Sequence, residues 1–336
     1  MTELIRIAVS LLPVFVFLTG LIIIDSYKLV RLRFILQTIL IGCLVAVMSL
    51  LANSWLLTQL PLDISVYSRF VAPIIEELLK ALYLVFLMKS KKVGFMVDGA
   101  ILGFAIGAGF AFIENIYYLR SLQDSNLFLW IIRGFGTAVM HGGTTALFGI
   151  IAKNLTDRNS SEKIHPFLPA LGIAILIHSI FNQFILPPVI TTLTLLITLP
   201  LLIIFVFDRS EKSLQKWLGV GFDSDMALLE MIISGNISNT RIGQYLHSLK
   251  TRFPGEVVAD MLCLLRIHLE LSVRAKGTLM MRETGFRVTP DPEINEKFNE
   301  LRYLEKSIGK TGQLAILPFL HTSSRDLWQL YMLRKK

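Results

Sequence analysis

The amino-acid sequence predicts an all-α protein, a polytopic bundle of about seven transmembrane helices followed by a cytoplasmic helical domain. Hydrophobic residues make up 53% of the chain and charged residues only 17%, against about 25% charged residues in an average soluble domain. Residues 1–207 hold 24 charged residues, whereas the shorter stretch 208–336 holds 34. The composition therefore divides the chain into a membrane domain, 1–207, and an aqueous domain, 208–336.

Apolar segments long enough to cross a bilayer recur throughout the first domain. A helix needs about 20 mostly apolar residues to span a hydrocarbon core of about 30 Å. The first segment is flanked by charged residues and has no small-residue cleavage site, so we expect a membrane anchor and not a cleaved signal peptide. Only Pro187 and Pro188 separate the last two segments. The seven predicted spans are about residues 4–24, 34–57, 68–88, 97–119, 127–152, 168–186 and 188–207.

The distribution of basic residues between the spans predicts the orientation. The loops 25–33, 89–96 and 153–167 each carry three Lys or Arg residues, and the intervening loops carry about one or none. Cytoplasmic loops collect Lys and Arg, and these three loops fall on one side of a seven-span protein. We therefore expect the N-terminus outside the cell and the C-terminus in the cytoplasm, with the lipid bilayer around the first domain.

The domain after residue 207 is expected to be helical and solvated. Apolar residues recur at helical spacing in 226–233 and 257–271, and residues 289–293, Thr-Pro-Asp-Pro-Glu, predict a turn before a last helix. The net charge of the chain is +8, but no basic stripe with interleaved aromatic residues accompanies it, so no nucleic-acid partner is expected. Cys43 and Cys263 lie on opposite sides of the domain boundary, which excludes a cysteine zinc site and argues against a structural disulfide.

Ionisable side chains within the predicted spans are the candidates for function. Each costs on the order of 2.5–3.5 kcal/mol at the centre of a membrane helix, so such residues are rare and usually functional. They lie in four spans: Glu76, Glu77 and Lys80 in the third, Glu114 in the fourth, Arg133 and His141 in the fifth, and His178, with Asn182 one turn later, in the sixth.

The third span contains two adjacent carboxylates and one lysine. Lys80 is four residues from Glu76 and three from Glu77, so it can pair with either carboxylate on a helix. A structural ion pair is one interpretation of this group. The second carboxylate is then a surplus negative charge in a low dielectric, which needs a metal, a proton or another cation. A carboxylate in that position can also act as a general base on water.

The two histidines and Glu114 suggest a metal site. Alone, each histidine could be a core histidine with satisfied hydrogen bonds, and Glu114 could bond to a neighbouring helix. Two neutral imidazoles and one or more carboxylates that converge from different helices form the ligand set of a catalytic zinc site, with an open position for water. His178 and Asn182 share a helix face, so the asparagine could orient the histidine or donate a hydrogen bond to an oxyanion.

The depth of these residues allows a single site. With a rise of about 1.5 Å per residue, Glu114 lies about 8 Å, His178 about 12 Å, Glu77 about 14 Å and His141 about 21 Å from the outer ends of their spans. All four therefore fall between the outer leaflet and a level just past the midplane.

These residues and their order resemble the PrsW-type intramembrane proteases, which are distant relatives of the CAAX prenyl endopeptidases. The resemblance covers about residues 68–186. It implies hydrolysis of a peptide bond within or beside a bacterial inner membrane, with a membrane protein such as a single-pass anti-sigma factor as the substrate, cleaved on its outer side. The matching motifs are Glu76-Glu77-x-x-Lys80, Phe110-x-x-x-Glu114-Asn115, His141 following Arg133, and His178-x-x-x-Asn182.

Residues and resemblance together define one candidate active site. The family is classed as metallopeptidases, which implies a divalent metal with zinc as the candidate ion, although its CAAX relatives have also been read as using a glutamate-activated water without metal. The candidate catalytic residues are Glu76, Glu77, Lys80, Glu114, His141, His178 and Asn182, with Glu114, His141 and His178 as candidate metal ligands.

Other classes of protein fit the sequence less well. No His-Glu-x-x-His, Gly-x-Ser-Gly or Gly-x-Gly-Asp motif is present, so the signatures of other intramembrane proteases are missing. A proton- or ion-coupled transporter would also use buried Glu, His and Lys, but the sequence has no repeated half. A membrane scaffold for the cytoplasmic domain would leave the intramembrane ionisable residues unexplained.

Overall fold

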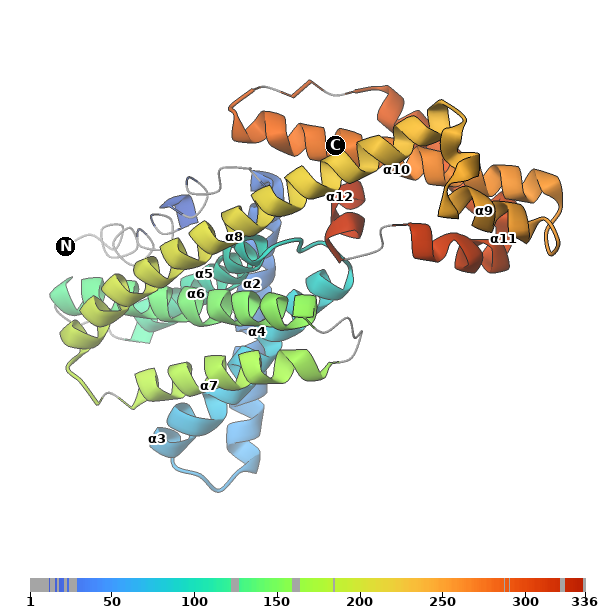
Figure 1. The fold of residues 1–336 in the computed structure, drawn as a ribbon. Helices are drawn as coiled ribbons and strands as arrows, with labels where there is room; N and C mark the ends of the chain where they lie inside the picture. Colours follow the sequence, from blue (N-terminus) through green and yellow to red (C-terminus); the bar gives the residue numbers. More distant parts are fainter. Residues whose placement is uncertain are drawn as a thin grey trace. The chain divides into compact units, whose positions relative to one another are not determined.

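The computed structural model is built from helices over the residues that it describes (Figure 1). These are residues 12, 16, 18–20, 23, 29–121, 127–158, 164–183, 185–286, 288–289, 291–320 and 324–334. The first predicted span, 4–24, lies largely outside this set. The chain divides into two compact units, Met1–Glu211 and Lys212–Lys336.

The first unit consists of long apolar helices joined by short turns. Its described helices are α2 (Leu32–Gln59), α3 (Ile64–Val66), the π-helix η1 (Tyr67–Val71), α4 (Ala72–Lys89), α5 (Met96–Ser121), α6 (Leu127–Arg158), the 3-10 helix η2 (His165–Phe167), α7 (Leu168–Asn182) and the beginning of α8 (Pro188–Ile233). The second unit contains the end of α8, η3 (Asn236–Asn239), α9 (Arg241–Leu249), α10 (Gly255–Glu283), α11 (Glu293–Ile316), η4 (Leu317–Phe319) and α12 (Ser324–Arg334).

Among the described residues, five helices are long and apolar enough to cross a membrane. They are Leu32–Gln59, Met96–Tyr118, Gly134–Asp157, His165–Asn182 and Val189–Ile233. Helix α4 is not among them; it has 18 residues and includes four charged ones, Glu76, Glu77, Lys80 and Lys89. The predicted all-α fold with several membrane helices is confirmed, whereas the count of seven stays a prediction.

Helix α8 differs from the predicted last span. The span was expected to end near residue 207, but the helix continues through the charged residues that follow to Ile233. Its polar part, from Asp208 to Gln215, contains no proline or glycine, and Glu, Lys, Arg, Gln and Leu are good helix formers. The change in polarity therefore marks where the helix leaves its apolar stretch and not where it ends.

Two glycines let α5 pack directly against the backbones of its neighbours. A Cβ atom on Gly107 would lie 2.1 Å from the carbonyl oxygen of His141 in α6, and one on Gly109 would lie 2.0 Å from that of Ile39 in α2. Small residues allow such close approach in membrane helix bundles. Helix α5 therefore packs tightly against both α2 and α6, and its contact with α6 lies at a predicted site residue.

Helix α2 shows how the first unit presents its surface. Its buried residues, including Ile35, Gly42 and Val45, form one face, while Leu40 and Leu51 on the other side remain 64% and 66% exposed. A water-facing helix would carry polar residues there. An apolar outer face is what a lipid environment requires.

The second unit has an apolar core with one buried polar cluster. Lys276 of α10 forms an ion pair with Asp225 of α8 at 2.5 Å, and both side chains are almost completely buried. Ser272 donates a hydrogen bond to the same carboxylate and accepts one from Gln329 of α12 at 2.8 Å. This cluster joins three helices of the unit.

Candidate active site

Helix α4 supplies two oppositely charged residues that are fully buried. Lys80 Nζ lies 2.7 Å from Glu77 Oε1, and the side chains are 0% and 1% exposed. The spacing in sequence allowed Lys80 to pair with either carboxylate, and in the structure it pairs with Glu77. Glu76, one residue earlier, is thus the adjacent carboxylate that does not form the ion pair with Lys80.

Lys80 also connects α4 to α5 and α6. Its Nζ atom lies 2.7 Å from His141 Nδ1 and 4.1 Å from the centre of the Phe110 ring. An ammonium group has hydrogens to donate and no acceptor, so His141 Nδ1 must accept. The imidazole proton of His141 is then on Nε2.

His141 Nε2 lies 2.6 Å from Glu114 Oε2 of α5. With the proton on Nε2, the imidazole donates this hydrogen bond to the carboxylate. Gly107, two turns before Glu114 on α5, allows the close contact with the backbone at His141. The packing of α5 on α6 therefore sets this pair.

His178 of α7 faces both adjacent carboxylates of α4. Its Nδ1 lies 2.8 Å from Glu77 Oε1, and its Nε2 lies 3.8 Å from Glu76 Oε2. Its ring meets that of His141 edge to face, with the ring centres 4.9 Å apart. The predicted convergence of the two histidines is thus present in the structure.

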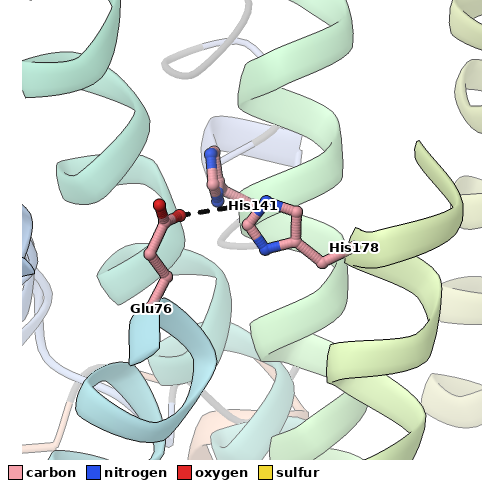
Figure 2. Close-up of side chains that lie close together, drawn as sticks. All are labelled: Glu76, His141 and His178. Atoms are coloured by element: carbon pink, nitrogen blue, oxygen red, sulfur yellow. Dashed lines mark ion pairs between the residues drawn. The ribbon is translucent and has the colours of Figure 1, made fainter. Parts of the chain in front are cut away.

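Glu76, His141 and His178 form a group that could hold a metal ion (Figure 2). Each offers one ligand atom, and these atoms lie within 4.8 Å of one another. Ligand atoms about 2.0–2.2 Å from a tetrahedral zinc ion lie about 3.4 Å apart, so the group is slightly wider than a bound ion requires. The contact of Glu77 with His178 Nδ1 leaves Nε2 as the atom available to a metal, as is usual for metal-binding histidines. The residues present therefore fit a divalent metal.

The carboxylate of this group differs from the one predicted. The sequence suggested Glu114 with the two histidines, whereas Glu76 completes the group among the described residues. Glu114 contacts the His141 imidazole instead. Sequence spacing places residues on a helix face. It does not decide which of two carboxylates on different helices lies nearer to the pair of histidines.

Two further polar residues reach the site and were missed in the sequence. Asn53 of α2 donates from Nδ2 to Glu76 Oε1 at 3.4 Å, and Tyr67 donates from its hydroxyl to Asn53 Oδ1 at 2.9 Å. The signal in the sequence was the neutral amide of Asn53 inside the second predicted span, which carries no charge and therefore does not stand out among the ionisable residues.

Asn182 takes a different partner from the predicted ones. Its Nδ2 donates to the backbone oxygen of Ser68 at 2.9 Å, which ties the end of α7 to η1. Arg133 belongs to α6, and its side chain lies outside the described part. Asn182 therefore supports the segment that leads into α4.

The geometry defines a class of protein: a helical membrane protein with a buried Glu/His centre, contributed by α4, α5, α6 and α7, that can hold a divalent metal and transfer protons. Residues 30–207 match the family described as PrsW family intramembrane metalloprotease, and the chain belongs to this family. The resemblance found in the sequence is thereby confirmed.

One curated relative is Protease PrsW of Clostridioides difficile (strain 630). It is 33% identical over 124 residues, which are 35% of this chain and 51% of the relative. The chain thus spans about half the length of this curated relative. No solved structure matches the chain. Both matches are to proteases, and neither supports the transporter alternative.

Proposed function

We propose that this protein is an intramembrane endopeptidase that hydrolyses a peptide bond of a membrane protein with water activated at the Glu/His centre. One observation carries the proposal: three carboxylates, two imidazoles and one ammonium group, from four helices, meet with ligand and hydrogen-bond spacing in an apolar bundle. Such groups are costly to bury, and a hydrolytic centre needs them.

Glu76, His141 and His178 are the proposed metal ligands, with zinc as the candidate ion. A bound divalent ion would act as a Lewis acid and lower the pKa of a bound water towards about 7. His178 can use its Nε2 lone pair because Nδ1 is engaged with Glu77. His141 can use Nε2 once its proton is released to solvent, as metal binding requires, which leaves the neighbouring Glu114 carboxylate ionised.

Glu77 and Lys80 are proposed as the support of the centre. The Glu77 carboxylate receives hydrogen bonds from Lys80 and from His178, and its side chain is 1% exposed, so it has little access to a water molecule. Its negative charge favours the Nδ1 proton of His178. Lys80 neutralises part of that charge in the low-dielectric interior.

Glu114 is proposed as the general base. Its side chain is 27% exposed and is thus more open than that of Glu77. A carboxylate in hydrogen-bond contact with an imidazole can take a proton from water and deliver it to the leaving amine. This role differs from the ligand role predicted for Glu114, and the two are alternatives for the same residue.

The proposed substrate is a single-pass membrane protein, such as the anti-sigma factor that the family resemblance suggests, cleaved near the outer side of the membrane. The predicted depths of the site residues favour that side. Cells that express wild type, His178→Ala or Glu76→Gln would be compared by proteomics of membrane fragments. His165→Ala is the matched control, because His165 is an exposed histidine of η2.

A cleavage product of a membrane protein is expected with wild type and His165→Ala and is expected to disappear with both site variants. Identical fragments in all four strains, at equal protein levels, would contradict the peptidase function. For the metal, activity of purified protein should vanish with a strong chelator and return with Zn²⁺. Full activity after metal depletion, verified by elemental analysis, would leave a glutamate as the only activator of water.

A further inference from the structure

Asn53 contacts the centre from outside the motifs that defined it. It lies on α2 and is half-buried, and its Nδ2 donates to Glu76 Oε1 at 3.4 Å. Nδ2 also lies 3.3 Å from the hydroxyl of Ser49, one turn earlier on the same helix. Among the described residues of α2, Asn53 is the one whose side chain hydrogen-bonds to Glu76.

Tyr67 hydrogen-bonds the amide oxygen of Asn53. Its side chain is 5% exposed, and its hydroxyl donates to Asn53 Oδ1 at 2.9 Å. If the amide were turned over, Oδ1 would face a carboxylate oxygen of Glu76 and the Nδ2 hydrogens would face a hydroxyl. The acceptor-only carboxylate therefore selects the orientation in which the amide donates to Glu76, and the tyrosine hydroxyl satisfies Oδ1 in that orientation.

The two oxygens of Glu76 consequently have different surroundings. Oε1 receives the Asn53 hydrogen bond, and Oε2 faces His178 Nε2 at 3.8 Å. Holding one oxygen restricts rotation of the carboxylate and leaves the other pointing into the group formed with His141 and His178. This is the arrangement by which polar neighbours orient a metal-binding carboxylate.

The segment that carries Tyr67 is itself fastened to the site. Tyr67 is the first residue of the π-helix η1, which leads directly into α4 and thus to Glu76. The next residue, Ser68, accepts a hydrogen bond at its backbone oxygen from Asn182 of α7, and α7 also carries His178. π-Helical turns occur often at functional sites.

We propose that Asn53 and Tyr67 are positioning residues that hold the Glu76 carboxylate in the orientation needed to bind a divalent metal together with His141 and His178. The inference rests on the proposed function, since it concerns the same centre. Asn53 and Tyr67 act through Glu76 and need not touch the substrate.

The test is the Zn²⁺ affinity of the purified full-length protein in detergent, measured by competition with a chromophoric chelator. Asn53→Leu keeps the size of the side chain and removes its hydrogen bonds with Glu76, Tyr67 and Ser49, and Tyr67→Phe removes one hydroxyl. The matched controls are Gln59→Leu on the exposed end of α2 and Tyr83→Phe on α4. Loss of a neighbour that orients a ligand typically weakens metal binding by about 10–100-fold.

Asn53→Leu is expected to weaken Zn²⁺ binding by about 10–100-fold and Tyr67→Phe by about 3–10-fold, with both controls unchanged. In a Glu76→Gln background, Asn53→Leu should add no further loss. Tyr67→Phe keeps the ring and thus tests the inference even if Asn53→Leu does not fold. Wild-type affinity in Tyr67→Phe and Asn53→Leu, or Zn²⁺ binding absent from the wild type, would overturn the inference.

The Zn²⁺-affinity experiment tests the positioning role of Asn53 and Tyr67 independently of the proposed peptidase function. Weaker Zn²⁺ binding in the two variants supports the inference even if no peptide cleavage is found, in which case the peptidase function alone fails. Cleavage by the wild type with unchanged Zn²⁺ affinity in the variants contradicts the inference alone.

Discussion

Replacing Gly107 by alanine tests whether the contact between α5 and α6 sets the site. The added Cβ would lie 2.1 Å from the His141 carbonyl oxygen and 2.4 Å from its carbonyl carbon. Ordinary van der Waals contacts of a Cβ atom are 3.4–4 Å long. Both atoms belong to helix backbone and cannot rotate away. The two helices would therefore have to separate by about 1 Å at His141.

The expected loss has two parts. Overpacking of a close-packed contact costs about 1–3 kcal/mol of unfolding free energy. A displacement of about 1 Å at a catalytic group can reduce the rate about 100-fold. Denaturant unfolding of the purified protein in detergent measures the first effect, and the rate of substrate cleavage or the Zn²⁺ affinity measures the second.

Gly172→Ala is the matched control, because a Cβ there meets no atom within 4 Å and Gly172 lies within helix α7. It should leave activity unchanged and, since alanine favours helix, alter the unfolding free energy by no more than about 1 kcal/mol. If Gly107→Ala matched Gly172→Ala in both stability and activity, the packing explanation of the His141 position would be refuted.

Three further predictions concern the second unit and the topology. Lys276→Met leaves the buried Asp225 without its cation and should destabilise the protein by about 3–5 kcal/mol in denaturant unfolding; a loss under 1 kcal/mol would exclude this role. Burial opposes ionisation of Glu270, but hydrogen bonds from Lys297 and Arg266 lower its pKa below the ordinary value. The pKa of Glu270 is thus lower in the folded than in the unfolded protein. The stabilisation is complete above the unfolded pKa and is lost as the pH falls through the folded pKa, so Glu270→Gln should flatten the acidic part of the curve of unfolding free energy against pH. An unchanged curve would argue against this contribution of Glu270. A fluorescent reporter at the C-terminus should fluoresce and a phosphatase there should stay inactive, whereas the reverse would invert the predicted topology.

The fold could be predicted from the sequence because it depends on local composition. Runs of about 20 apolar residues specify membrane helices whatever their neighbours are. The predicted spans 34–57 and 97–119 accordingly correspond to α2 and α5. The end of α8 could not be predicted in the same way, since polarity changes at residue 208 while helix propensity does not.

Part of the site could also be predicted from the sequence, because a charged residue inside an apolar segment can be identified without knowledge of the fold. The cost of burying a charge in a membrane helix singles out six residues. All six lie in one network of contacts: Glu76, Glu77, Lys80, Glu114, His141 and His178. Asn53 does not stand out in this way because its amide carries no charge, and asparagines in membrane helices commonly make ordinary hydrogen bonds between helices.

The sequence by itself determined the helical membrane class, the set of ionisable residues and the family, since these follow from composition and motif order. Only the tertiary structure decided that Lys80 pairs with Glu77, that Glu76 lies with His141 and His178 in a group that could hold a metal ion, and that Glu114 contacts His141. Helical spacing permits Lys80 to reach Glu76 or Glu77 equally. The choice depends on how closely α4, α5, α6 and α7 approach one another. That distance is set by packing at residues such as Gly107, which is far in sequence from Lys80 and His141.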